Sequence, residues 1–177
     1  AADTSELARD TRARVERITA AAGGAMGLTR RVRKALRRGT AHATIDDVVE
    51  AVRTTLAPTF GDAPLVATCA HGARGVLVKD RADEITLAVL HVALRAFRIA
   101  GSGSLHLTAR LDTGRDLVVE LFARGPIGDG QDGELSADVE VAQLQASAVA
   151  MLAALGGTAE VELTGPGELR VALVLPG

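Results

Sequence analysis

Apolar residues recur at alternating steps of three and four through the first part of the chain. This spacing is typical of a helix that packs along one seam, here Val15, Ile18, Ala22, Ala25, Thr29, Val32 and Leu36. Three glycines in the middle, Gly23, Gly24 and Gly27, each cost about 1 kcal/mol relative to alanine in a helix, so a turn between two shorter helices is the alternative. Because the apolar phase continues across them, we favour one long helix over residues 3–38, ended by Gly39.

Helical spacing predicts three further helices, and short or alternating apolar runs predict six strands. The helices are bounded by Thr44 and Pro58, by Asp80 or Asp83 and residue 99, and by residues 140 and 155, with the pair Gly156-Gly157 as the stop. The strands are expected at residues 65–69, 75–78, 105–111, 117–122, 159–163 and 169–175.

This order of elements predicts an α/β fold of two layers. The helices are expected to stack on one face of a mixed, mostly antiparallel sheet, which gives a two-layer α/β sandwich preceded by the long helix. We therefore divide the chain into a basic helical segment, residues 1–40, and a sandwich domain, residues 41–177.

The composition restricts the core and the function. The chain has three Phe and neither Tyr nor Trp, so Val, Leu, Ile and Ala must form the core. The scarcity of aromatic residues also argues against the binding of single-stranded nucleic acid by base stacking. The single cysteine, Cys69, excludes an internal disulfide and a Cys-rich zinc site, and we expect it to be a small buried residue. Neither a membrane-spanning apolar run nor a signal peptide is visible, so we expect a cytoplasmic setting without membrane contact.

Charge is divided unevenly along the chain. Residues 1–40 hold ten Arg and Lys against four Asp and Glu, whereas the rest holds ten against eighteen. The basic residues crowd the end of the first helix, at Arg30, Arg31, Arg33, Lys34, Arg37 and Arg38. They fit a solvated face near a helix C-terminus better than a nucleic-acid patch, because Val32 and Leu36 of the same turns still need a packing partner.

Four segments carry a family resemblance from Thr44 onward. They are TIDDVVEAVRTTLAP, GVLVKDRADEITLAVLHVALRAF, GSLHLTARLDTGRDLVVELFARGP and ALGGTAEVELTGPGELRVALVLP. In this order they resemble the ATP-binding catalytic domain of sensor histidine kinases, which has the GHKL-type ATPase fold. The last segment matches the family's ending, with its Gly pair, its G-x-G and its final LP.

The resemblance also implies that the nucleotide site is degenerate. It places Val92 at the Asn that binds Mg²⁺ in active members, Ala88 at a position that is often Asn, and Ala123 at the Asp that accepts a hydrogen bond from adenine. None of these side chains has an oxygen to offer. The glycine-rich phosphate loop is missing too, since residues 137–145 read ADVEVAQLQ. We therefore expect no ATP or Mg²⁺, no catalytic residue and no metal site.

Substitutes for the lost groups are available in the sequence. Asp129 or Asp132 of a Gly-rich stretch would replace the missing Asp, and Arg95, at the Lys-like position of the motif, would contact an anion. In that case the chain is an active but divergent sensor histidine kinase that uses ATP and Mg²⁺. We favour the alternatives, a flexible surface loop and a solvated arginine.

The resemblance implies a dimer as well. The basic helix corresponds to the second helix of the kinase dimerisation hairpin, so a homodimer is expected through residues 5–38, with Val15, Ile18, Ala22, Ala25, Val32 and Leu36 at the interface. The family's phosphate-accepting His is absent from this helix, and the helix that bears it would be lost or lie upstream. The four histidines, His42, His71, His91 and His106, are not at metal-ligand spacing.

We favour a two-component signalling module that acts as a dimeric scaffold or signal-relay domain. It would dock a response-regulator-like or sensor-domain protein. One alternative is the divergent kinase. Another is a histidine phosphotransferase with a degenerate kinase fold, for which His42 would be the residue to test. Nucleic-acid binding ranks last.

Overall fold

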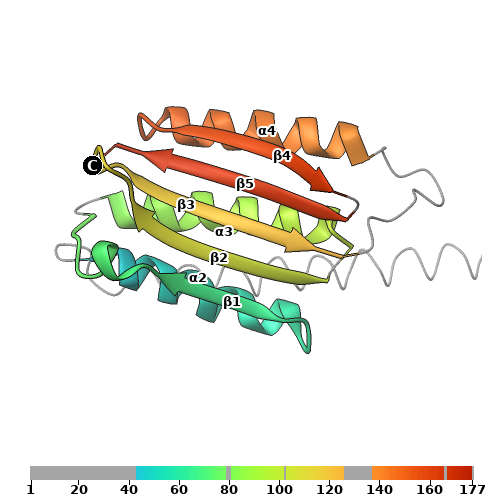
Figure 1. Cartoon of the computed structure of the whole chain (residues 1–177), viewed down its shortest axis with the longest axis horizontal. Coiled ribbons are helices and arrows are strands. Elements are labelled where there is room, and N and C mark those ends of the chain that lie inside the picture. Colours follow the sequence, from blue (N-terminus) through green and yellow to red (C-terminus); the bar gives the residue numbers. More distant parts are fainter. Residues whose placement is uncertain (1–42, 79–80, 102, 126–136, 166, 177) are drawn as a thin grey trace, which may run out of the picture. The chain divides into compact units, whose positions relative to one another are not determined.

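The computed structural model describes residues 43–78, 81–101, 103–125, 137–165 and 167–176. This part of the chain forms one five-stranded sheet with three helices on one of its faces (Figure 1). The helices are α2 (Ile45–Phe60), α3 (Ala82–Ile99) and α4 (Ala137–Ala153), and a short 3-10 helix, η2, covers His71–Ala73. The strands are β1 (Leu65–Cys69), β2 (Ser104–Leu111), β3 (Leu117–Arg124), β4 (Thr158–Gly165) and β5 (Glu168–Leu175). The predicted two-layer α/β sandwich is confirmed.

The sheet has the strand order β1-β2-β3-β5-β4. β1 runs parallel to β2, and the other three pairs are antiparallel. The face toward the helices carries the buried residues of the alternating strands, which on β5 are Leu169, Val171, Leu173 and Leu175. The helices pack their own apolar stripes against this face, so the core lies between the two layers.

Helix α2 begins as predicted but ends later. The Thr44 hydroxyl accepts a hydrogen bond from the Asp47 N–H, and an Asp47 carboxylate oxygen accepts one from the Thr44 N–H at 2.8 Å, which completes a capping box. The prediction that Pro58 ends the helix was wrong, because Pro58 lies inside the last turn. The extra turn buries Phe60 against Phe97 of α3, with ring centroids 3.8 Å apart, and this contact offsets the hydrogen bond that proline cannot donate.

The predicted strand at residues 75–78 was also wrong. Leu77 makes one isolated antiparallel bridge to Thr44, and the Gly75 N–H donates to the Asp46 carboxylate at 2.8 Å. Gly75 has a φ of +71°. The segment therefore closes over the start of α2 instead of joining the sheet.

The start of α3 also differs from the prediction. Asp83 lies within the first turn, where its charge favours the helix dipole, and it is not the cap. Arg81 holds the N-cap position without a side-chain capping bond. The alternative cap, Asp80, lies outside the described residues.

Helix α4 starts earlier than predicted, at Ala137, and stops at the predicted glycine pair. The Gly157 N–H donates to the Leu152 carbonyl and the Gly156 N–H to the Ala153 carbonyl, and Gly156 has a φ of +70°. These bonds form a Schellman motif, the common way to end a helix at glycine. Gly157 has a different requirement, because a Cβ there would lie 2.4 Å from the Val174 carbonyl oxygen.

The predicted helix at residues 3–38, its dimer seam and His42 lie outside the described residues, so they stay predictions. None of the helices in the described ranges has both the length and the apolar composition needed to cross a membrane.

Candidate nucleotide site

Three apolar side chains occupy the positions that the family resemblance assigns to ligand-binding groups. Ala88 and Val92 lie one turn apart on α3, and Ala123 lies near the end of β3. Their exposed fractions are 2%, 1% and 1%. Since α3 packs directly on β3, all three residues belong to the core between helix and sheet.

These side chains do not fit ATP or Mg²⁺. A magnesium ion takes oxygen ligands, and neither the Val92 isopropyl group nor the Ala88 methyl group provides one. The adenine amino group needs a hydrogen-bond acceptor, and the Ala123 side chain has none. Exposed fractions of 1–2% place all three side chains in the interior of the domain.

Side chains of α3 reach α4 along a seam between the two helices. Arg98 forms an ion pair with Glu140 at 3.3 Å, and Arg95 donates to the Gln143 amide oxygen at 3.3 Å. At the other end, the Arg81 guanidinium donates to the Leu155 carbonyl, one of the backbone acceptors that the end of α4 leaves open. The contacts place α3 and α4 antiparallel, and Arg95, one predicted substitute, already has a protein partner.

His91 lies on the same stripe of α3, four residues before Arg95. Its Nε2 atom is buried and has no hydrogen-bond partner among the described residues. Burial, and secondly the charge of Arg95, lower the pKa of His91. The imidazole is therefore neutral at pH 7 and adds no positive charge to the seam.

Solved structures with a similar fold are histidine kinases. The catalytic domain of the histidine kinase ThkA matches with a TM-score of 0.55 at 10% identity, over 76% of this chain and 93% of that one. The Acinetobacter baumannii histidine kinase AdeS matches with a TM-score of 0.54 at 17% identity, over 92% of this chain and 79% of that one. The described domain has the fold of a histidine kinase catalytic domain.

A third structure of this fold, full-length ShkA, was solved in complex with AMPPNP. It matches with a TM-score of 0.57 at 19% identity, over 86% of this chain and 34% of ShkA. No protein-family model and no curated protein matches the chain. Identities of 10–19% establish the fold alone.

The remaining candidates do not gather into a site. His71 is exposed in η2, and His106 is exposed on β2, as its alternation predicted. We expected Cys69 to be buried, but it is only half-buried, because it ends β1 beside the exposed turn. Burial, and then the charge of Asp46, raise the pKa of its thiol. Within the described ranges, no group of three His, Cys, Asp or Glu residues is placed to hold a metal ion. Asp129 and Asp132 lie outside those ranges.

Sequence reasoning located the three apolar positions but missed the seam beside them. Arg81 and Leu155 are 74 residues apart, so no local pattern announces their contact. The i, i+4 and i+7 spacing of His91, Arg95 and Arg98 was the available signal, because such residues share one helix face.

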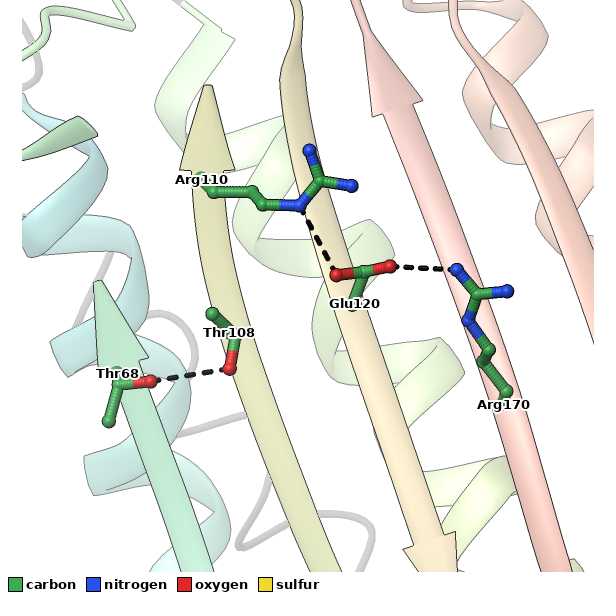
Figure 2. A network of polar contacts seen from close by, with 5 residues as sticks. All are labelled: Thr68, Thr108, Arg110, Glu120 and Arg170. Atoms are coloured by element: carbon green, nitrogen blue, oxygen red, sulfur yellow. Dashed lines mark hydrogen bonds and ion pairs between the residues drawn. The ribbon is translucent and has the colours of Figure 1, made fainter. Parts of the chain in front are cut away.

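The face of the kinase-like sheet that points away from the helices carries a charged network. Figure 2 shows Glu120 on β3 between Arg170 on β5, at 2.8 Å, and Arg110 on β2, at 3.2 Å. Thr68 and Thr108 share a hydrogen bond across β1 and β2 at 3.3 Å. Hydrogen bonds from Arg170 first, and from Arg110, lower the pKa of Glu120.

Glu120→Gln is expected to destabilise the domain by about 1 kcal/mol at pH 7, because it leaves two arginines facing one neutral amide. A lowered pKa in the folded state means that the carboxylate stabilises the fold above pH 4.5, the usual Glu value, and loses this effect as the pH falls through the lowered pKa. The difference between wild type and variant should therefore shrink below pH 4.5. Urea unfolding from pH 3.5 to 7 measures it.

Glu50→Gln is the matched control for this network. Glu50 pairs with Arg53 at 2.7 Å, but its side chain is 59% exposed on α2, so we expect a smaller loss, about 0.3–0.5 kcal/mol. Equal losses for the two variants, or a Glu120→Gln loss that does not change with pH, would contradict the role assigned to Glu120.

Proposed function

We propose that this chain is a two-component signalling module with a degenerate histidine kinase-like domain, which binds no ATP and acts as a dimeric scaffold or signal-relay domain. One observation carries the proposal. The positions at which active kinases of this fold are expected to hold metal and adenine are Ala88, Val92 and Ala123, and all three are buried in the core.

The contacts between α3 and α4 support this reading. A phosphate-binding site needs cationic side chains that are free to pair with the ligand. Here Arg95 and Arg98 instead meet Gln143 and Glu140. These contacts between side chains link α3 to α4. Such a helix layer suits a domain that presents a constant surface to protein partners.

The partners follow from the same proposal. We expect a homodimer through residues 5–38, with a response-regulator-like or sensor-domain protein as the second partner, in a cytoplasmic setting. A module of this kind would pass a conformational signal between them without chemistry of its own.

A divergent but active kinase is the competing proposal. ShkA, which shares the fold, was solved with AMPPNP bound, and Asp129 and Asp132 of this chain are carboxylates in the stretch between β3 and α4. In this alternative they substitute for the missing acceptor at Ala123.

Titration of the purified full chain with ATP and Mg²⁺ distinguishes the two. We expect no heat of binding and no thermal shift up to millimolar ATP, because Ala88, Val92 and Ala123, at the positions of the family's ligand-binding groups, offer no oxygen ligand. Binding would be easy to detect, since nucleotide at about 100 times its Kd stabilises a protein by about 2.7 kcal/mol. ATP without Mg²⁺ and AMPPNP with Mg²⁺ are the matched titrations.

Saturable, Mg²⁺-dependent binding would overturn the scaffold proposal. Asp129→Asn, Asp132→Asn and Arg95→Ala should then each weaken the affinity, and incubation with labelled ATP would show whether the chain phosphorylates itself. Phosphoryl transfer from a phosphorylated receiver domain that is lost in His42→Ala would instead assign a phosphotransferase.

A further inference from the structure

The open face of the sheet, which points away from the helices, carries more apolar residues than a water-facing sheet needs. Antiparallel sheets with one solvated face usually alternate apolar residues inside with polar residues outside. Here the open face holds five apolar side chains, Val66, Val118, Phe122, Ala172 and Val174, of which only Val118 is buried, with 5% of its surface exposed. Phe122 and Val66 are 43% and 41% exposed, although the two other phenylalanines of the chain are buried. This face is suited to a partner.

The charges of the open face are polarised across the strands. The half formed by β2 and β3 carries Arg110 and Arg124 against one carboxylate, Glu120, and the half formed by β5 and β4 carries Glu160, Glu162 and Glu168 against one arginine, Arg170. Two charges lie near the middle, where Glu120 and Arg170 pair with each other at 2.8 Å (Figure 2). The net charge is therefore positive on one half and negative on the other.

We propose that the open face binds the open face of a second copy of this chain, around a twofold axis that runs along the strands between β3 and β5. A polarised face is complementary to itself when the axis exchanges its basic and acidic halves. An axis perpendicular to the strands would place β4 against β4, and glutamates against glutamates. The distribution of charge therefore favours a second copy of the chain as the partner and a twofold axis that runs along the strands.

The register of the sheet gives the opposing residues. The rows across the strands read His106, Phe122, Arg170, Glu162, and Ser104, Arg124, Glu168. Turned about the proposed axis, His106 faces Glu162 of the second copy and Phe122 faces Arg170. Arg124 faces Glu168 of the second copy, although it already pairs with Glu168 of its own chain at 2.8 Å, so the contact between copies would extend this ion pair into a network. Arg170 already lies over the Phe122 ring of its own chain at 5.9 Å, so the same cation–π contact would form between copies. Val118 faces Val174 and adds an apolar contact near one end of the two strands.

This inference depends on the fold and not on the proposed function, so nucleotide binding would leave it intact. It is also separate from the dimer expected through residues 5–38, and the two contacts need separate measurements. Cross-linking from a cysteine on the open face reports the sheet contact alone, because the reagent joins only thiols that lie close to each other in the two copies.

In the full chain with Cys69→Ala, Ala172→Cys gives one thiol at the centre of the open face. A short bis-maleimide should join two copies, since packed sheets lie about 10 Å apart. The matched control is Ala146→Cys, on the exposed side of α4, which should give little cross-linked product. Phe122→Asp in the Ala172→Cys background should abolish the product, whereas Leu87→Asp, at a 42% exposed residue of α3, should not.

Sedimentation of the full chain over a range of concentrations provides the second measurement. Phe122→Asp should weaken one association step more than about tenfold, as expected for an aromatic residue at the centre of an interface. Leu87→Asp should leave every step unchanged, and salt should weaken the same step that Phe122→Asp affects. Equal cross-linking of the two cysteine variants, or identical masses for wild type and Phe122→Asp, would overturn the proposal.

Discussion

Phe97→Ala is expected to lower the free energy of unfolding by about 3–5 kcal/mol. Phe97 and Phe60 stack with an interplanar angle of 27°, and they are 7% and 5% exposed. They join α3 to α2 in a core that otherwise relies on aliphatic side chains. Removal of one ring leaves a cavity that alanines and valines nearby cannot fill, because packed interiors relax only in part.

The third phenylalanine supplies the matched control. Phe122→Ala removes the same ring from the open face, where it is 43% exposed, so we expect a loss of about 1 kcal/mol or less. Urea unfolding at low protein concentration, which keeps association between copies out of the result, measures both variants. Losses of equal size would show that the stack between α2 and α3 is not the stabilising contact that its burial indicates.

Much of the fold was predictable because its signals are local. The alternation of Leu169, Val171, Leu173 and Leu175 specifies a half-buried strand, and the structure has it within one residue of the predicted bounds. Thr44 was recognised as an N-cap and the glycine pair after α4 as a stop, since each makes its hydrogen bonds to neighbours in sequence.

The wrong predictions have a common physical cause. Proline normally ends a helix, which is why Pro58 was expected to end α2, and residues 75–78 have the composition of a strand. In both cases contacts with distant segments determine the local structure instead. Phe60, after the proline, packs against Phe97 of α3. Leu77 forms a β-bridge with Thr44 and does not pair with a strand of the sheet. Local preference is a weak constraint wherever tertiary contacts are available.

The candidate site, too, was predictable only in part. The family resemblance pointed to Ala88, Val92 and Ala123, but the sequence alone could not tell whether these residues line an open site or fill a core. Their exposed fractions of 1–2% come from the packing of α3 on β3. The link from Arg81 to Leu155 could not be foreseen either, because it depends on how two helices far apart in sequence are placed.

Gly125→Ala is expected to cost about 3 kcal/mol, the upper end of the range for overpacking. Gly125 follows β3 and Gly103 precedes β2, and at these two glycines the backbones of the two segments approach each other closely. A Cβ on Gly125 would lie 1.8 Å from the Ala100 carbonyl oxygen, and one on Gly103 would lie 1.9 Å from the Arg124 carbonyl oxygen. Both obstacles are backbone atoms, so no side chain can move aside and the two segments must separate. The hydrogen bond from the Gly125 N–H to the Gly167 carbonyl, 3.0 Å long, would weaken with them.

Gly72→Ala is the matched control, because it adds the same methyl group with no atom within 4 Å of it. Gly72 also lies outside the left-handed region, so its change in stability should stay within about 0.5 kcal/mol. Gly61 separates the two causes of strain, since it has a φ of +56° but open space around it. Gly61→Ala should cost about 1–2 kcal/mol, because a residue with a Cβ rarely adopts this backbone conformation. The expected order of losses in urea unfolding is therefore Gly125, Gly61, Gly72. If Gly125→Ala unfolds like Gly72→Ala, the close crossing of the two segments is not a feature of the protein in solution.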